Sequence, residues 1–391
     1  MNKFFLILYL TIFSFCLSSC RDDIGPETKK PSRTLLIYAV ASNNLESYLE
    51  KDMEEMIEAA PSVDGLGSNI NVLLYSVTKS STSVATLYSL AKTSSGEWTF
   101  QPLRTYDRDT FSTDPQRMNE IYSAARELAP ADTYGLILWS HGTGWIPEFY
   151  SHGGTRTGMQ RSFGWDSYQG VTDKCDLIEL ADAIPAGMFD YIWFDACYMM
   201  GIEVAYQLRD KCDYIGGYPS EDWSPGMNYD STLPMLAAYK PDLEGAAKSF
   251  YDYYSDSNMA VTVTLVATDG LDRLADAAAD VYAAGSRPSS SSGLVDYGRY
   301  PCRGLYDFGQ FSEAYFCDSP SSDESDLLTR FKSALSDVVV FGGCSSKDFN
   351  GKDGVFSPQR YSGFSCHFPG TSDNASEEYY LNLDWTKATN P

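Results

Sequence analysis

The chain has 391 residues, of which 43% are hydrophobic, and a formal charge of −24 at neutral pH. A chain of this kind buries the core of one large domain or two ordinary ones, which excludes pervasive disorder. The charge excludes nucleic-acid binding, because no basic stripe is present to release counterions from phosphates, whereas an acidic surface attracts basic substrates.

The N-terminus has the features of a bacterial export signal. Lys3 precedes an apolar run over 4–15, and Leu17-Ser18-Ser19-Cys20 resembles a lipobox. The apolar run is too short to span a bilayer comfortably. We expect removal of residues 1–19 and acylation of Cys20, with 20–33 as a flexible tether to a membrane. The acidic residues after Cys20 favour the outer membrane or cell surface of a Gram-negative bacterium.

Strand-like and helix-like segments alternate from residue 34. The apolar run over 34–40 predicts a core strand, and the cluster Ser42-Asn43-Asn44 is expected to cap a helix to about residue 60. The pattern next predicts a strand over 69–77, a segment of antiparallel β-structure over 84–106, a helix from Pro115 to about 128, and a strand over 134–139.

The strand over 134–139 ends in Ser140-His141-Gly142. A histidine at a strand end, followed by a glycine that permits close approach of a ligand, is a candidate general base. The chain has two other histidines, His152 and His367, which we interpret as structural. A Cys366–His367 pair is disfavoured because neighbouring strand residues point to opposite faces.

Residues 146–172 are polar and glycine-rich with no clear period, which predicts a long loop beside His141. Loops of this length inside a domain are usually functional or cleaved. Arg156 and Arg161 lie in it, either as cleavage positions or as solvated surface residues.

The apolar residues 191–194 predict a second buried strand that runs into a helix, with apolar positions at 202, 204, 205 and 208. Cys197 is therefore expected where strand becomes helix, and there N–H groups and the helix dipole lower a thiol pKa. A buried structural cysteine is the alternative. The interval from His141 is long enough for one crossover helix, so both residues can lie at one edge of a parallel sheet.

The remaining segments continue the alternation. We expect a helix over 177–184, a strand over 214–218, a turn over 220–223 at the edge that carries His141 and Cys197, a helix over 242–255, a strand over 260–268 and a helix over 271–284. This order predicts an α/β fold, an open and mostly parallel sheet flanked by helices, over 34–285. The low-complexity segment 286–293 marks a boundary, after which 286–391 forms a smaller α+β portion with a helix over 326–340 and a strand over 364–368.

Two motifs, SHGTGW at 140–145 and WFDACYMMGIEVAYQL at 193–208, together resemble the clostripain family of cysteine peptidases, in the caspase-like clan with gingipains, legumains and caspases. The resemblance implies a Cys197–His141 dyad. His141 accepts the thiol proton or pairs with the thiolate, and the N–H groups of Gly142 and Cys197 form the oxyanion hole.

The resemblance also implies cleavage of protein or peptide substrates after Arg or Lys, with Asp195 in the S1 pocket. The competing interpretation of Asp195 is a helix N-cap. Asp222 and Glu221 are weaker S1 candidates. Family members are activated by a cut between the His and the Cys, which makes Arg156 and Arg161 the candidate positions for self-cleavage of a zymogen.

The chemistry needs no cofactor. Clostripain responds to calcium, but no D-x-D-x-D-G loop indicates a calcium site here. Besides Cys20 and Cys197, six cysteines remain in the mature chain, a set that permits disulfides and fits no zinc pattern. The alternative to an enzyme is a surface lipoprotein that binds glycan or basic peptides through its 28 Tyr, 20 Phe and 7 Trp.

Overall fold

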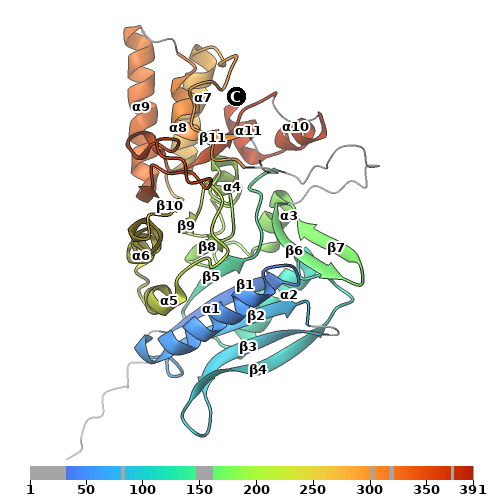
Figure 1. The fold of residues 1–391 in the computed structure, drawn as a ribbon. Coiled ribbons are helices and arrows are strands. Elements are labelled where there is room, and N and C mark those ends of the chain that lie inside the picture. The colour runs from blue at the N-terminus through green and yellow to red at the C-terminus, as the bar shows by residue number, and fades with distance from the viewer. Residues whose placement is uncertain are drawn as a thin grey trace, which may run out of the picture. The chain divides into compact units, whose positions relative to one another are not determined.

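The computed structural model describes residues 32–80, 84–146, 162–299, 302, 304–316, 321–370 and 374–390. Within them, nine strands form one sheet in the order β12-β10-β9-β8-β5-β1-β2-β3-β4, flanked by helices (Figure 1). The strands are β1 (Arg33–Ala41), β2 (Ile70–Thr78), β3 (Val84–Lys92), β4 (Trp98–Asp107), β5 (Thr133–Trp139), β8 (Tyr191–Asp195), β9 (Tyr214–Gly217), β10 (Thr262–Ala267) and β12 (Val339–Cys344).

The sheet is parallel in its centre and antiparallel at both sides. Strands β9, β8, β5, β1 and β2 run parallel. On one side the hairpin β3–β4 pairs antiparallel with β2. On the other side β10 pairs antiparallel with β9 and with β12. The carboxyl ends of the parallel strands therefore share one edge, which is where open α/β sheets place their sites.

Strand alternation divides the apolar core into two layers, one on each face of the sheet. In β1, Leu36, Tyr38 and Val40 belong to one layer, and Leu35, Ile37 and Ala39 to the other. The second layer is closed by α1 (Glu46–Ala59), α5 (Tyr229–Ala237) and α6 (Leu243–Asp256). The first is closed by α2 (Pro115–Leu128), α3 (Leu177–Ala183), α4 (Ile202–Gln207), α7 (Leu271–Ala284), α8 (Phe308–Glu313), α9 (Ser322–Val338) and α11 (Asp384–Thr389).

Part of the expected loop over 146–172 is folded. Strands β6 (Phe163–Tyr168) and β7 (Val171–Cys175) form an antiparallel hairpin. Gln169 and Gly170 at its turn both have positive φ, 50° and 80°, as a two-residue hairpin turn requires. The expectation of a structureless loop is wrong for these residues, because their short, polar alternation is too weak a pattern to mark strands.

Two helix starts also differ from expectation. Helix α4 begins at Ile202, so Cys197 lies in a loop and not at a helix N-terminus. Helix α1 begins at Glu46 after Leu45 without a side-chain cap. Asn43 bonds the N–H of Leu45, but the Ser42-Asn43-Asn44 cluster otherwise serves the region around His141. Helix α5, which contains Pro234, was not expected from the sequence.

Residues 286–391 share the sheet and the core with the preceding segments. They supply β12 to the large sheet, and β11 (Leu305–Asp307) with β13 (Ser365–His367) form a two-stranded sheet beside α10 (Asn374–Tyr380). Pro31–Pro391 is one compact unit. Within the described ranges, no helix combines the length and apolarity that a membrane crossing requires. The six cysteines that the structure describes form no disulfide with one another: Cys175, Cys197, Cys212, Cys302, Cys344 and Cys366.

Candidate active site

His141 and Cys197 follow the ends of two neighbouring parallel strands. Trp139 at the end of β5 is paired with Asp195 at the end of β8, and the N–H of Ser140 donates to the Asp195 carbonyl at 3.3 Å. Gly142 lies so close to the second loop that a Cβ there would be 2.4 Å from the Cys197 carbonyl oxygen. The loops of His141 and Cys197 are therefore in direct main-chain contact, as their spacing in the sequence predicted.

The His141 imidazole is partly buried and held on two sides. Its Nε2 bonds Oδ1 of Asn44 at 2.9 Å, and its ring centroid is 5.3 Å from that of Trp165 on β6. Because an amide oxygen only accepts, Nε2 carries the proton and Nδ1 is left as the acceptor. Burial and the ammonium of Lys174 lower the pKa of His141 to about 4. At neutral pH the imidazole is therefore uncharged and able to take a proton.

The Cys197 thiol is held by the loop after β9. The N–H of Asp222 donates to Sγ at 3.3 Å, and Sγ lies 3.8 Å from the Asp222 carbonyl oxygen. Burial and the Asp222 carboxylate raise the pKa of Cys197 above its ordinary value. The expectation of a lowered thiol pKa is wrong for this conformation, because the sulfur is buried beside an acidic side chain and the helix that follows it, α4, begins only at Ile202.

The hydrogen bonds of the two candidate residues go to different partners in the described part of the chain. His141 bonds Asn44, whereas Cys197 bonds Asp222. The main-chain N–H groups of Gly142 and Cys197 donate to no described group, while the next residue, Tyr198, donates to the Ser220 carbonyl at 2.8 Å. Tyr198 has φ +62°, a strained conformation for a bulky residue directly after the thiol.

Asp195 points to the sheet face covered by α1 and α5, where it is buried. Its carboxylate accepts from the hydroxyl of Tyr229 at 2.8 Å, the N–H of Met227 at 3.4 Å and the hydroxyl of Tyr218 at 3.5 Å. These partners, and not a helix N-terminus, satisfy Asp195, so the N-cap interpretation is wrong. Gly226 has φ +67° and would place a Cβ 2.9 Å from Asp195 Oδ1, which explains the glycine there.

Asp195 belongs to a cluster of three carboxyl groups, in which Asp52 and Asp195 are buried and Asp222 is partly buried. It hydrogen-bonds the side chain of Asp222, and Asp52 from α1 lies near enough to repel its charge. Burial raises the pKa of Asp195 to about 6, and burial with the Asp195 charge raises that of Asp222. Burial and Asp195 also raise the pKa of Asp52 to about 9, although Asp52 accepts from the Trp139 indole at 2.8 Å. The ammonium of Lys51 opposes this rise at Asp52 but does not cancel it.

Glu221 is engaged outside the cluster. Its Oε2 accepts from Nη1 of Arg299 at 2.8 Å in a partly exposed ion pair. Although it is paired with Arg299, Glu221 adds to the effect of Asp222 in raising the pKa of the Cys197 thiol.

Several predicted residues do not enter the site. Cys20, His152, Arg156 and Arg161 lie outside the described residues. His367 is buried and bonds Glu377 at 3.0 Å, as a structural histidine does. In the described part of the chain, no three His, Cys, Asp or Glu side chains are arranged so that they could hold a metal ion.

Asn44, Asp52 and Trp165 contact the site but were not predicted for it. Asn44 follows β1, the strand next to β5, so the rule that strand ends share an edge could have indicated it. Asp52 lies in the middle of an amphipathic helix that carries many acids, but it follows Leu49 by three residues and precedes Met56 by four, so its place on the buried stripe could have separated it from the others.

The family model described as Peptidase C11, clostripain family, matches residues 37–281. Clostripain of Hathewaya histolytica is 26% identical over 237 residues, which are 54% of this chain and 43% of clostripain. The chain thus matches less than half the length of that relative.

Two solved structures are similar over nearly the whole chain. A secreted C11 cysteine protease of Bacteroides thetaiotaomicron, in complex with an irreversible peptide inhibitor, is 26% identical with a TM-score of 0.76, over 92% of this chain and 99% of that one. An inactive zymogen C11 protease of Parabacteroides distasonis is 26% identical with a TM-score of 0.75, over 92% and 98%.

Proposed function

Since the chain belongs to the clostripain family of C11 cysteine peptidases, we propose that it is a cysteine endopeptidase with Cys197 as nucleophile and His141 as general base. The observation that carries this proposal is the pairing of Trp139 with Asp195, which brings the loops of His141 and Cys197 to one edge of the sheet.

The environment of His141 favours general-base activation of the thiol over a preformed ion pair. An uncharged imidazole with Nδ1 free to accept takes the Cys197 proton as the sulfur attacks the scissile carbonyl carbon. The oxyanion then receives hydrogen bonds from the N–H groups of Gly142 and Cys197, neither of which has another acceptor in the described structure. His141 returns the proton to the leaving amine, and water hydrolyses the thioester.

The acidic cluster supports a preference for Arg or Lys at P1. Two carboxyl groups that share a hydrogen bond beside Cys197 offer a strong site for a side-chain cation. When a guanidinium or ammonium group enters, the raised pKa of Asp195 and Asp222 falls and the shared proton is released. The phenols of Tyr218 and Tyr229 hold Asp195 in place.

The conformation described here supports a latent form that is activated by cleavage. The thiol pKa is raised and Sγ bonds Asp222, so Cys197 is held as a poor nucleophile. One relative was solved as an inactive zymogen. Self-cleavage after Arg156 or Arg161, between the two motifs, would free the His141 loop to realign.

We further propose that the protein is exported and anchored by a lipid on Cys20. The support is the lipobox-like sequence at 17–20 and the description of one structural relative as secreted. Its partners would then be proteins or peptides outside the cytoplasm with Arg or Lys at P1.

The buried aromatic residues weigh against a glycan-binding module. Among the described residues, the exposed large aromatics are Tyr214, Tyr239 and Tyr253, and most other aromatic rings lie in the core. Stacking platforms for sugars need exposed rings, so the aromatic content mainly reflects packing.

A peptide assay tests the proposed function. Peptides that differ only at P1 (Arg, Lys or Gln) are compared with wild type, Cys197→Ala, His141→Ala and Asp195→Asn, and Asp210→Asn serves as an exposed carboxylate control. We expect cleavage after Arg and Lys only, loss with the first two variants, and loss of the P1 preference with Asp195→Asn. Equal hydrolysis by wild type and Cys197→Ala would refute the mechanism.

A further inference from the structure

The β6–β7 hairpin lies directly on the loop that carries His141. The N–H of Gly164 donates to the His141 carbonyl at 3.0 Å, and the N–H of Thr143 donates to the Ser162 carbonyl at 3.0 Å. Phe163, which lies between Ser162 and Gly164, is paired with Gly142 in an antiparallel bridge. The main chain on both sides of His141 is therefore bonded to the start of the hairpin.

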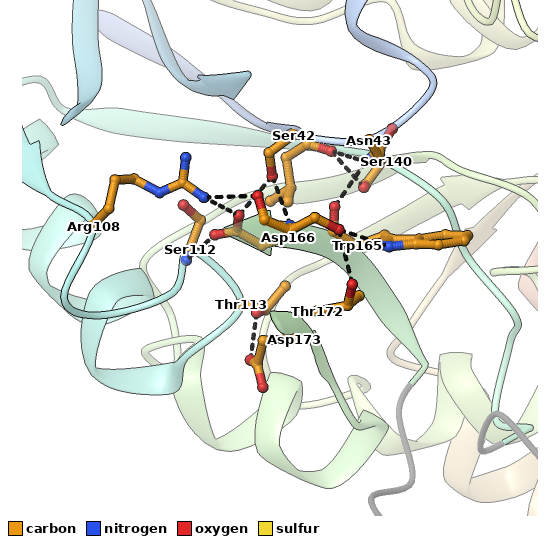
Figure 2. A network of polar contacts seen from close by, with 12 residues as sticks. Ser42, Asn43, Arg108, Ser112, Thr113, Ser140, Trp165, Asp166, Thr172 and Asp173 are labelled. Carbon is orange, nitrogen blue, oxygen red and sulfur yellow. Dashed lines mark hydrogen bonds and ion pairs between the residues drawn. The ribbon is translucent and has the colours of Figure 1, made fainter. Parts of the chain in front are cut away.

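A buried carboxylate anchors the hairpin to the sheet. Asp166 on β6 is fully buried, and its Oδ1 accepts from the Ser42 hydroxyl at 2.6 Å and Nη2 of Arg108 at 2.5 Å. Its Oδ2 accepts from the N–H of Ser112 at 2.7 Å. Figure 2 shows Asp166 at the centre of these contacts, with Arg108 and Ser42 converging on it. The three donors come from the end of β1, the end of β4 and the approach to α2.

The same contacts fix Trp165, the residue before Asp166. The Asn43 amide donates to the Trp165 carbonyl at 2.8 Å, and the Trp165 indole donates to the Ser167 hydroxyl at 3.1 Å. Ser42, which bonds Asp166, also accepts from the N–H of Ser167 at 3.1 Å. Trp165 is thus held through its main-chain carbonyl and its indole, and the two residues that follow it are both bonded to Ser42 (Figure 2).

We propose that the β6–β7 hairpin is the positioning element for His141, in which the buried Asp166 fixes Trp165 against the imidazole. The inference rests on the proposed function for the role of His141 as general base. It assigns Trp165 and Asp166 as positioning residues, since they act through His141 and not on the substrate.

The geometry explains why the imidazole needs such a support. Its described hydrogen-bond partner is Asn44, which is itself exposed, so that one bond holds the ring weakly. The indole at 5.3 Å supplies a rigid surface that limits rotation of the ring and excludes water from it. The groups that face His141 are Asn44 after β1, Trp165 on β6, Lys174 on β7 and the Cys197 loop after β8. Lys174 also contacts Trp165, with Nζ 4.7 Å from the ring centroid.

Two substitutions of Trp165 test the proposal. Trp165→Leu removes the aromatic surface, whereas Trp165→Phe retains a ring, and both leave the contacts of Asp166 intact. The pKa of His141 is measured by NMR titration of the full chain, with His141→Ala to assign the signal among three histidines. The kcat and KM for an Arg-P1 peptide are measured across pH.

We expect Trp165→Leu to raise the pKa of His141 from about 4 toward 6.5, the unperturbed value. The acid limb of the kcat profile should move to higher pH with it. Loss of alignment in Trp165→Leu should lower kcat about a hundredfold with KM little changed. Trp165→Phe should keep the pKa of His141 and the kcat close to their wild-type values. A folded Trp165→Leu variant with unchanged His141 pKa and unchanged kcat would overturn the proposal.

A matched pair of carboxylates in the hairpin supplies the control. Asp166→Asn should reproduce the Trp165→Leu result, while Asp173→Asn, which weakens the contact of β7 with Thr113 (2.6 Å), should leave the His141 pKa in place. Equal effects of the two would mean that general loosening of the hairpin is responsible, against the proposal. The NMR measurement needs no turnover. A wild type that cleaves no peptide even after the chain has been cut between the two motifs would therefore refute the proposed function, while the pKa of His141 still decides the role of Trp165.

Discussion

Asn44 fixes the tautomer of the candidate base through a single hydrogen bond of 2.9 Å to Nε2. We predict that Asn44→Ala lowers kcat about tenfold, the effect typical of partners that orient a histidine, and leaves KM nearly unchanged. Steady-state kinetics with an Arg-P1 peptide measures this. Asn119→Ala, which removes an exposed amide on α2, is the control. An Asn44→Ala variant with wild-type kcat would show that the bond has no role in catalysis.

Gly142 determines how closely the His141 loop approaches Cys197. A Cβ at this position would lie 2.4 Å from the Cys197 carbonyl oxygen and 2.8 Å from the Met199 side chain. Gly142→Ala must push the two loops apart, and we expect kcat to fall at least about a hundredfold, because displacements near 1 Å have effects of that size.

The matched control for Gly142→Ala is Gly170→Asn in the hairpin turn, where no neighbour lies within 4 Å and Asn tolerates the positive φ. Thermal unfolding should show both variants folded. Wild-type activity in a folded Gly142→Ala would contradict the close packing of the loops described here.

At the scale of the elements, helix α1 places Asp52 in the acidic cluster with Asp195 and Asp222. The pKa of Asp52 is about 9 when folded and about 3.9 when unfolded. The folded chain therefore binds one proton more than the unfolded chain between these values, so stability falls as pH rises through that window. Asp195 and Glu203, with pKa values of about 6 and 7, also make stability fall as pH rises, each over a narrower pH range than Asp52.

We predict that Asp52→Asn increases the free energy of unfolding at pH 8 by about 2 kcal/mol and flattens its decline with pH. The amide keeps an acceptor for the Trp139 indole. Urea denaturation at pH 5, 6, 7 and 8 measures the difference. A variant whose stability runs parallel to wild type over this series would show that Asp52 is not the group that titrates.

The sequence predicted the elements that carry the site better than the segments that complete it. The core strands β1, β5 and β8 are continuous apolar runs, and their order predicted the α/β fold that the structural matches confirm. The parallel arrangement holds for the centre of the sheet, while β10 and β12 pair antiparallel, since direction depends on connections that composition does not reveal.

The positions of His141 and Cys197 at one edge could be predicted because a strand end is a local signal. The residues that hold these two side chains in place could not be predicted as well. Trp165 and Asp166 lie in a polar hairpin, and Asp52 lies in a helix with several acids, where only its position on the buried stripe sets it apart. The contacts that make these residues important join segments far apart in the chain. The direction of the thiol pKa shift depends on burial and on Asp222 in a separate loop.

For the molecule as a whole, the central claim is that Cys197 is a nucleophile that depends on His141. A peptide acyloxymethyl ketone with arginine at P1 tests it, with the modified residue located by mass spectrometry of the intact and digested protein. We predict one adduct, on Cys197, which is absent in Cys197→Ala and forms about a hundredfold more slowly in His141→Ala. An adduct on another cysteine, or equal rates in wild type and His141→Ala, would contradict the account.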